Sequence, residues 1–483
     1  MSKAGIGLAV AAVAVVGALG TSYYMGSRVQ HGFEEFASTL QQGNKQLRVK
    51  IISYERGLFS STAQTEWTLA SRSAQWSFKA NHRISHGPLP RGHAAEIDTD
   101  FLLNDDADPG LKTALAGKAP LSAHTVVNWN QSADGTLNSP AFTAQLKNAT
   151  YDWGGMTAAL SMGAHSTAIK GKAEFAGLGF TDPQQKGLQI KGGTMEMDLQ
   201  QAKGHDFLVG PFKVALASMT MKGPLGGASA GDEEENDGDE ADGADSAQAP
   251  APAAEIETVA LEGLSFDTNT VLAGDVVNLD MKTSIKTIDI PKYKVSDVAL
   301  DFAMLNFDAA WLGQVQQLSR QGEGDLKELR AQLMQGLPQL LGRKPEFQIK
   351  RIAMRTEEGV SEVSGSLAYD GDASKPLNPA QDIKASLSLN LPKPVLQTLF
   401  SSRVRHKYQD TMEQLEQEVD EQRLSEAVQE NVKERLDALL EAGLLQEKDN
   451  AYTASFSYAA GEMQANGKPL ERDGLSTLMV SLP

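Results

Sequence analysis

The stretch "QWSFKANHRI", residues 75–84, alternates apolar and polar side chains without interruption. Successive side chains of a β-strand point to opposite faces, so this period of two predicts a strand with one apolar face. The preceding stretch, "YERGLFSSTAQTEWTL" (54–69), places further apolar residues at even spacings. The predicted apolar face of these two strands consists of Phe59, Trp67, Leu69, Trp76 and Phe78.

The same alternation recurs along most of the chain, separated by turns rich in Gly, Pro, Asn and Asp. It is clearest in "DIKASLSLNLP" (382–392), where Ile383, Leu387, Leu389 and Leu391 share one face. Many alternating strands joined by short turns favour an antiparallel sheet. The sequence therefore predicts an α+β, mainly β fold with an extended antiparallel β-sheet body.

Two segments break the strand pattern with helical spacing. Residues 308–341 carry leucines three or four positions apart, and residues 394–445 carry a second, longer apolar stripe on a charged helix. Both are predicted to be helical inserts packed on the sheet. The alternative for the second insert is a coiled-coil seam that makes a homodimer through helix 404–442.

Residues 4–27 contain no charged side chain, and about 20 apolar residues are enough to cross a bilayer as a helix. We predict a signal anchor or transmembrane helix at 1–28. The alternative is a secretory signal cleaved after Gly20. Both export the rest of the chain, so the predicted location is the bacterial inner membrane, single-pass, with the body in the periplasm. The absence of cysteine is consistent with this.

Charge and composition divide the body. The net charge of −18 argues against a nucleic-acid partner, because phosphates are bound by clustered Lys and Arg. Residues 223–258 are acidic and lack apolar periodicity, which predicts a disordered linker or loop between β-rich regions at 29–222 and 259–393. The alternative is that the acidic side chains of this segment form a specific calcium-binding site. Residues 446–483 are predicted to form a C-terminal β-hairpin, with a turn at Asn466-Gly467.

The sequence shows no catalytic constellation. A G-x-S-x-G motif is absent, and so is a phosphate-binding glycine loop. His82, His86 and His93 form a loose cluster, but strand residues four apart lie ~13 Å from each other, too far to share one metal ion. We therefore predict a protein that is not an enzyme, with no cofactor and no metal site.

Three stretches carry a family resemblance: "YERGLFSSTAQTEWTL" (54–69), "ISHGPLP" (84–90) and "LLEAGLLQEKDNAYTASFSYAAGEMQANGKPL" (439–470). Together they resemble the YdgA-like family of Gram-negative envelope proteins. The resemblance implies an inner-membrane anchor and a large periplasmic region, but no reaction. "LEGLSFDTNTVLAGDVVNLDMKTSI" (261–285) is similar in its general strand-like character, more than in any motif, to the AsmA-like bridge proteins. This similarity implies an apolar groove that carries phospholipid.

Two functions remain open at this stage. If the apolar sheet faces line an open groove, the protein binds lipid or another hydrophobic ligand and serves envelope homeostasis. If helices or other strands cover them, they form an ordinary closed core and the protein is a structural or interaction scaffold. We expect a core at the N-terminal strands and a groove at Ile383–Leu391.

Overall fold

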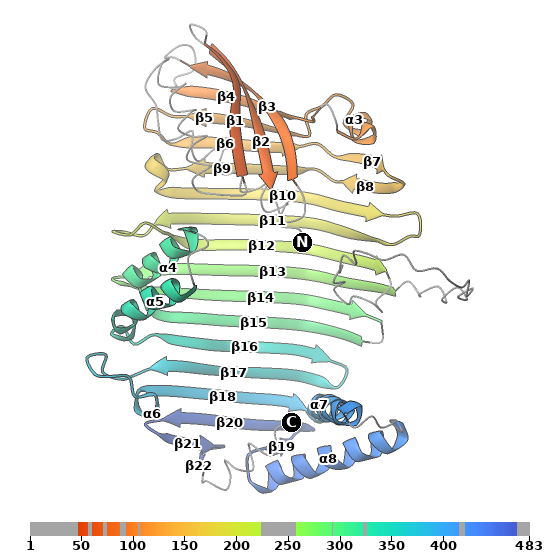
Figure 1. The fold of residues 1–483 in the computed structure, drawn as a ribbon, viewed down its shortest axis with the longest axis vertical. Helices are drawn as coiled ribbons and strands as arrows, with labels where there is room; N and C mark the ends of the chain where they lie inside the picture. The colour runs from red at the N-terminus through yellow and green to blue at the C-terminus, as the bar shows by residue number, and fades with distance from the viewer. Residues whose placement is uncertain are drawn as a thin grey trace, which may run out of the picture.

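The computed structural model describes residues 47–56, 60–70, 75–86, 93–104, 107–223, 257–291, 293–321, 326–414 and 421–470. These residues form one antiparallel sheet of 22 strands with six α-helices (Figure 1). This confirms the prediction of a mainly β, antiparallel fold. The sheet continues through both predicted β-rich regions, 29–222 and 259–393, because β12 (Leu208–Gly223) pairs directly with β13 (Glu257–Ala273) across the acidic segment.

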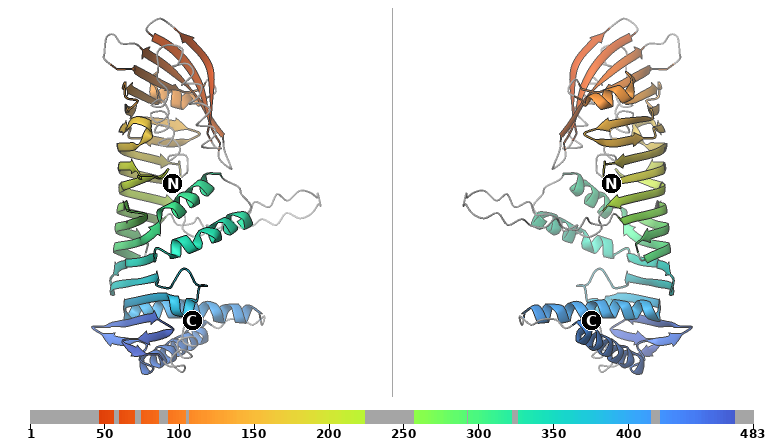
Figure 2. Two further views of the ribbon diagram at one scale, coloured as in Figure 1. Left: turned by 90° about the vertical axis from the view of Figure 1, so that its left-hand side faces the viewer. Right: turned by 90° about the vertical axis from the view of Figure 1, so that its right-hand side faces the viewer.

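The N-terminal strands fold over one end of the sheet (Figure 2). Pairing runs from β1 through β2, β3, β4, β5 and β6 to β9. A side hairpin of β7 and β8 lies next to helix α3 and joins β10. The bounds are β1 (Leu47–Arg56), β2 (Ser60–Ala70), β3 (Gln75–His86), β4 (Ala95–Leu102), α3 (Pro109–Leu115), β5 (Leu121–Val127), β6 (Ala133–Ser139), β7 (Phe142–Leu146), β8 (Ala149–Trp153) and β9 (Met156–Met162).

From β10 to β18 the sheet is a meander in which each strand pairs with the next in sequence. Strand β18 then pairs with β20, which also pairs with β19 and β21, and β21 pairs with β22. Helices interrupt the strands after β15, β17 and β18. The bounds are β10 (Ala168–Thr181), β11 (Gly187–Gln201), β12 (Leu208–Gly223), β13 (Glu257–Ala273), β14 (Val276–Ile290), β15 (Tyr293–Asp308), α4 (Ala309–Gln321), α5 (Leu326–Leu341), β16 (Glu346–Thr356), β17 (Gly359–Tyr369), α6 (Pro379–Asp382), β18 (Ile383–Pro392), α7 (Lys393–Gln414), α8 (Glu421–Glu441), β19 (Gln446–Lys448), β20 (Ala451–Ala459), β21 (Glu462–Ala465) and β22 (Lys468–Pro469).

One face of the meander is apolar from end to end. Directly paired residues of neighbouring strands place their side chains on the same face, so the register traces this face from strand to strand. We call it the apolar face. Its larger members are Ile169, Met195, Met197, Phe212, Val214, Phe266, Met281, Leu300, Phe302, Phe347, Leu367, Leu387 and Phe456.

The opposite face of the meander is polar and carries ion pairs that link adjacent strands. Lys170 pairs with Asp198 at 2.9 Å, and Arg351 pairs with Glu362 at 3.4 Å. Exposed pairs of this kind add little stability. They show instead which side of the sheet is in contact with water.

The apolar alternation changes phase within the long strands. In β13, Val259 and Leu261 occupy odd positions, whereas Leu264 and Phe266 after Gly263 occupy even positions. In a strand with regular pleating, the apolar side chains before Gly263 would therefore lie on one face of the sheet and those after it on the other. Neighbouring strands of the meander show the same change, as in β11 between Ile190 and Met195.

Backbone conformation explains this phase change. Gly155, Gly192, Gly263 and Asp297 have φ of 92°, 60°, 63° and 49°, and the register places them along one row that crosses the sheet. A positive φ turns the pleat over, and glycine reaches it without steric cost. Trp153 beyond the row packs on Phe175 before it, with ring centroids 5.3 Å apart. The apolar side chains thus stay on one face.

Three coverings lie on the apolar face (Figure 2). The N-terminal strands cover one end, helices α4 and α5 project from the middle, and α7 and α8 cover the other end. The helical inserts predicted at 308–341 and 394–445 correspond to α4–α5 and α7–α8.

Several predicted features fall outside the described residues: the membrane helix at 1–28, almost all of the acidic segment 223–258, Phe59, and the chain beyond 470. Across the ranges that the structure does describe, none of the helices combines the length and the apolar character needed to span a bilayer.

Candidate hydrophobic-ligand surface

The N-terminal part of the predicted apolar face is a closed core. Trp67 on β2 has no exposed surface, its ring stacks on Phe78 at 6.2 Å, and it meets Phe101 of β4 edge-on at 6.0 Å. Residues of β9 and β10, including Leu160 and Ile169, pack against the same cluster. The sheet folds back on itself here, so these side chains are enclosed between its two parts. The structure does not describe the side chains of Leu69 and Trp76.

A buried polar chain crosses this core. The Nε1–H group of Trp67 donates a hydrogen bond to Thr65 Oγ1 at 2.7 Å. His82 on β3 lies between two threonines, with Nε2 2.8 Å from Thr65 Oγ1 and Nδ1 2.9 Å from Thr99 Oγ1. Burial disfavours the charged imidazolium and lowers the pKa of His82 to about 4. These contacts give His82 a structural role.

The histidines of the loose cluster noted in the sequence have separate polar partners where their side chains are described. His93 is held by Asn128, with Nδ1 and Oδ1 3.1 Å apart, whereas His82 is bound between Thr65 and Thr99. Within the described ranges, no group of three or more His, Asp and Glu side chains is placed to hold a metal ion.

Helices α7 and α8 close the other end of the apolar face. Their buried stripe includes Phe400, Val404 and Leu436, and it packs with Leu389 and Leu391 of β18 and with strand β20. The apolar stripe that would form a dimer seam is therefore occupied within the chain over the described part of both helices. Leu389 and Leu391 belong to this second core.

An exposed apolar area lies between the coverings. Phe347 on β16, Leu367 on β17 and Leu387 on β18 are 39%, 52% and 40% exposed. Phe347 pairs directly with Leu367, and Leu387 pairs with Gly365, two residues from Leu367 on the same face. We call these three side chains the apolar floor.

The apolar floor is continuous with half-buried rings and aliphatic groups. Phe302 on β15 stacks on Phe347 with centroids 6.0 Å apart, and Phe456 on β20 pairs with Leu387. Ile383, also predicted to belong to the face, is half-buried beside Tyr369. Contiguous exposed apolar side chains mark ligand or partner sites more often than isolated ones do.

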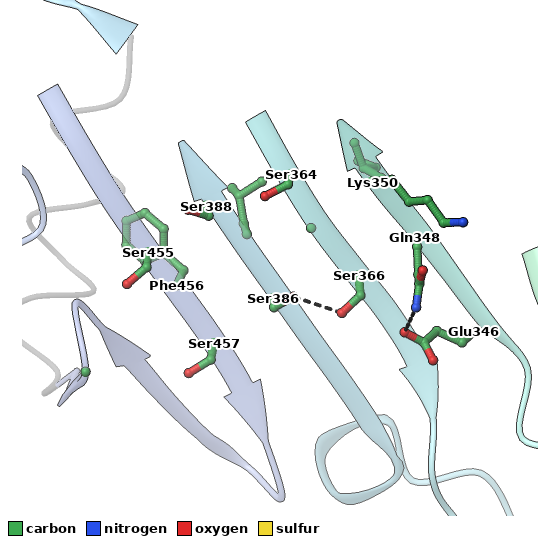
Figure 3. A pocket seen from close by; sticks show the side chains of 14 residues that line it. Glu346, Gln348, Lys350, Ser364, Ser366, Ser386, Ser388, Ser455, Phe456 and Ser457 are labelled. Atoms are coloured by element: carbon green, nitrogen blue, oxygen red, sulfur yellow. Dashed lines mark hydrogen bonds between the residues drawn. The ribbon is translucent and has the colours of Figure 1, made fainter. Parts of the chain in front are cut away.

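The other side of the same strands has a different chemistry (Figure 3). The side chains that line a hollow of about 460 Å³ there carry hydroxyl, amide and charged groups: Glu346, Gln348, Lys350, Ser364, Ser366, Ser386, Ser388, Ser455 and Ser457. The hollow is also bordered by Ile349, Gly365, Leu387, Phe456 and Gly467. The hydroxyl oxygens of Ser366 and Ser386 lie 2.8 Å apart and hydrogen-bond to each other. The strands therefore separate a surface suited to hydrocarbon from a surface suited to water.

The structure brings together only part of the set predicted from the sequence. Leu387 lies on the apolar floor, Ile383, Leu389 and Leu391 border it or join the adjoining core, and Trp67 lies in a separate core far along the sheet. Phe347 and Leu367 were missed. The stretches around them, "FQIKRIAMRT" and "SGSLAYD", do alternate, but a register shift between Ile349 and Ile352 obscures the pattern.

Comparison with known proteins places the chain in a family. Residues 1–472 match the model of a bacterial family described as "Bacterial protein of unknown function (DUF945)". The chain belongs to this family. The DUF945 match includes every strand described above and the residues before them. Neither the curated proteins nor the solved structures contain a match to the chain.

Proposed function

We propose that this DUF945 protein binds the acyl chains of lipid on its apolar face, centred on the apolar floor, and that it does so without catalysis or cofactor. The observation that carries the proposal is the exposure of Phe347, Leu367 and Leu387 side by side on a sheet whose charged groups lie on the other face. Each methylene group removed from water contributes roughly 0.8 kcal/mol, so even part of an acyl chain supplies useful affinity.

The dimensions of the apolar face support lipid rather than a small molecule. Strands β10 to β18 follow one another in the sheet, and strands lie 4.7–4.9 Å apart, so the face extends for roughly 40 Å. That exceeds the ~30 Å hydrocarbon thickness of a bilayer. The part of this face that lies between the coverings accommodates acyl chains laid across the strands.

The sequence supplies the setting of the proposal. The uncharged segment at 4–27 and the resemblance to YdgA-like envelope proteins support an inner-membrane anchor with the body in the periplasm. The similarity in strand-like character to AsmA-like bridge proteins supports lipid as the ligand. A role in envelope homeostasis would then consist of holding or passing lipid next to the membrane.

A scaffold without ligand is the second candidate. The observation that favours it is the closed packing at both ends of the apolar face, around Trp67 and around Leu436. In that case the exposed floor would be covered by another protein. Ligand capture by the floor distinguishes the two candidates.

Leu387→Asp in the full-length chain is expected to reduce capture of a fluorescent fatty acid at least tenfold. A carboxylate on the floor must be desolvated when hydrocarbon covers it, which costs more than the apolar contact that is lost. Capture is measured by fluorescence that co-migrates with the folded protein after gel filtration.

The matched control is Ser386→Asp. Ser386 directly precedes Leu387 in β18, and its exposed side chain lies on the polar face. It adds the same charge to β18 but should leave capture unchanged. Equal capture by wild type and Leu387→Asp, with both folded, would contradict the floor as the binding site. The absence of capture by the wild type would contradict lipid binding altogether.

A further inference from the structure

Helices α4 and α5 form a two-helix arm at one border of the apolar floor. Helix α4 continues directly from β15, which pairs with β16, the strand that carries Phe347. Figure 2 shows both helices projecting from the apolar face rather than lying flat on it. We call α4 and α5 the helical arm.

The root of the helical arm is fixed by a buried carboxylate. Asp308, the last residue of β15, is 1% exposed and caps α4 by accepting the backbone N–H of Trp311 at 2.9 Å. It also accepts hydrogen bonds from Gln339 Nε2 at 2.8 Å and from Arg343 Nε at 3.1 Å. Gln339 lies in the last turn of α5, and Arg343 lies just beyond it. Arg343 also bonds to Asp275 in the β13–β14 turn, at 3.0 Å. Both helices are thus tied to the sheet at their base.

Directly beyond this root, both helices contain residues that weaken a helix. Gly313 lies one turn into α4, and Gly336 and Pro338 lie within the last two turns of α5. Glycine lowers the stability of a helix because its backbone loses more conformational freedom on folding than that of other residues. An internal proline removes one helix hydrogen bond and disturbs the preceding turn. Kinks in helices occur at such residues. Gly336 faces Trp311 and Gln314 of α4, whereas the nearest neighbour of Gly313 is Phe207 beside β12.

Trp311 of α4 lies between Gly336 of α5 and Phe307 of β15. Its ring is 6.5 Å from that of Phe307 on β15, and a Cβ added to Gly336 would lie 2.5 Å from Trp311 Cδ1. Within the described residues no hydrogen bond engages its buried Nε1 atom. Trp311 is thus a bulky contact point that van der Waals packing holds in place.

We infer that the helical arm is a hinged lid for the apolar floor. The Asp308 network holds its base, the arm bends at Gly313 and at Gly336–Pro338 around the Trp311 ring, and its bending toward β16–β18 covers a bound acyl chain. This inference rests on the proposed lipid binding and adds the element that controls access to the site. A lid of this kind limits how fast lipid enters and leaves.

The test uses the full-length chain, which contains no cysteine, so two introduced cysteines carry the only labels. Nitroxides at Lys327→Cys on α5 and Lys282→Cys on the polar face of β14 report the distance from arm to sheet by pulsed electron spin resonance. Addition of oleate is expected to shift the distance distribution to a new, narrower maximum.

A stiffened arm supplies the second measurement. Gly313→Ala meets no atom closer than 4.0 Å, from Phe207, and Pro338→Ala restores a helix hydrogen bond. The double variant, whose arm cannot bend over the floor, should lose the oleate-induced shift and exchange bound fluorescent fatty acid at least fivefold faster than wild type. An exposed-site control is Gln335→Ala, which leaves the weak points unchanged.

The outcomes are distinct. Capture of oleate with an unchanged distance distribution and wild-type exchange in the stiffened variant would overturn the lid while leaving lipid binding in place. No capture of oleate by the wild type would overturn the proposed function and the lid with it.

Discussion

Replacement of Trp67 with alanine should destabilise the protein by roughly 3–5 kcal/mol, the range observed when a large aromatic side chain is removed from a closed core. The ring is fully buried, packs on Phe78 and Phe101, and donates a hydrogen bond to Thr65. Its loss leaves a cavity and removes one hydrogen bond of the buried polar chain. Urea denaturation monitored by circular dichroism measures the change.

Trp129→Ala is the matched control, because it removes the same ring from a position that is 53% exposed. We expect a change of less than about 1 kcal/mol there, since surface substitutions rarely exceed that value. If the two variants lose similar stability, the N-terminal strands do not enclose Trp67, and this part of the apolar face is open.

Acidification from pH 7 to pH 4 should destabilise the protein by about 3 kcal/mol through His82 alone. Its pKa is about 4 in the folded state, against the ordinary value of 6.5 for histidine. The unfolded chain therefore binds the additional proton first as the pH falls. The stability contributed by the neutral, buried ring is complete above pH 6.5 and is lost progressively down to pH 4.

The His82→Gln variant isolates this contribution from carboxylates that titrate in the same range. Glutamine keeps a donor and an acceptor near Thr65 and Thr99 but does not titrate. The variant should be less stable than wild type at pH 7, with a difference that shrinks by about 3 kcal/mol at pH 4. His165→Gln, at an exposed position in the short 3-10 helix Ala164–Ser166 between β9 and β10, is the control. A pH dependence in His82→Gln equal to that of wild type would show that the ring is accessible to protons in the folded state.

The architecture could be predicted from the sequence where local pattern determines it. Alternation in stretches such as 75–84 and 382–392 indicates strands, and helical spacing at 308–341 and 394–445 indicates the inserts, because burial of one face imposes both periods. The change of phase at Gly263 is also visible in the sequence. Its consequence is not, because the positive φ that keeps Leu261 and Leu264 on one face is a property of the folded backbone.

The candidate site could be predicted only in part for a related reason. Alternation shows that Trp67 and Leu387 each belong to an apolar face, but it does not show what lies above that face. Trp67 is buried because the sheet folds back over it, and Leu387 is exposed because the coverings end on either side of it. Exposure depends on contacts between elements distant in sequence, and no local pattern encodes them.

The most direct test of acyl-chain binding is to map where a photoreactive fatty acid attaches to the full-length chain. After irradiation, digestion and mass spectrometry identify the modified peptides. We predict attachment within strands β16, β17 and β18, at or next to Phe347, Leu367 and Leu387. Attachment confined to the polar face of these strands, or absence of attachment to the three strands, would contradict the account.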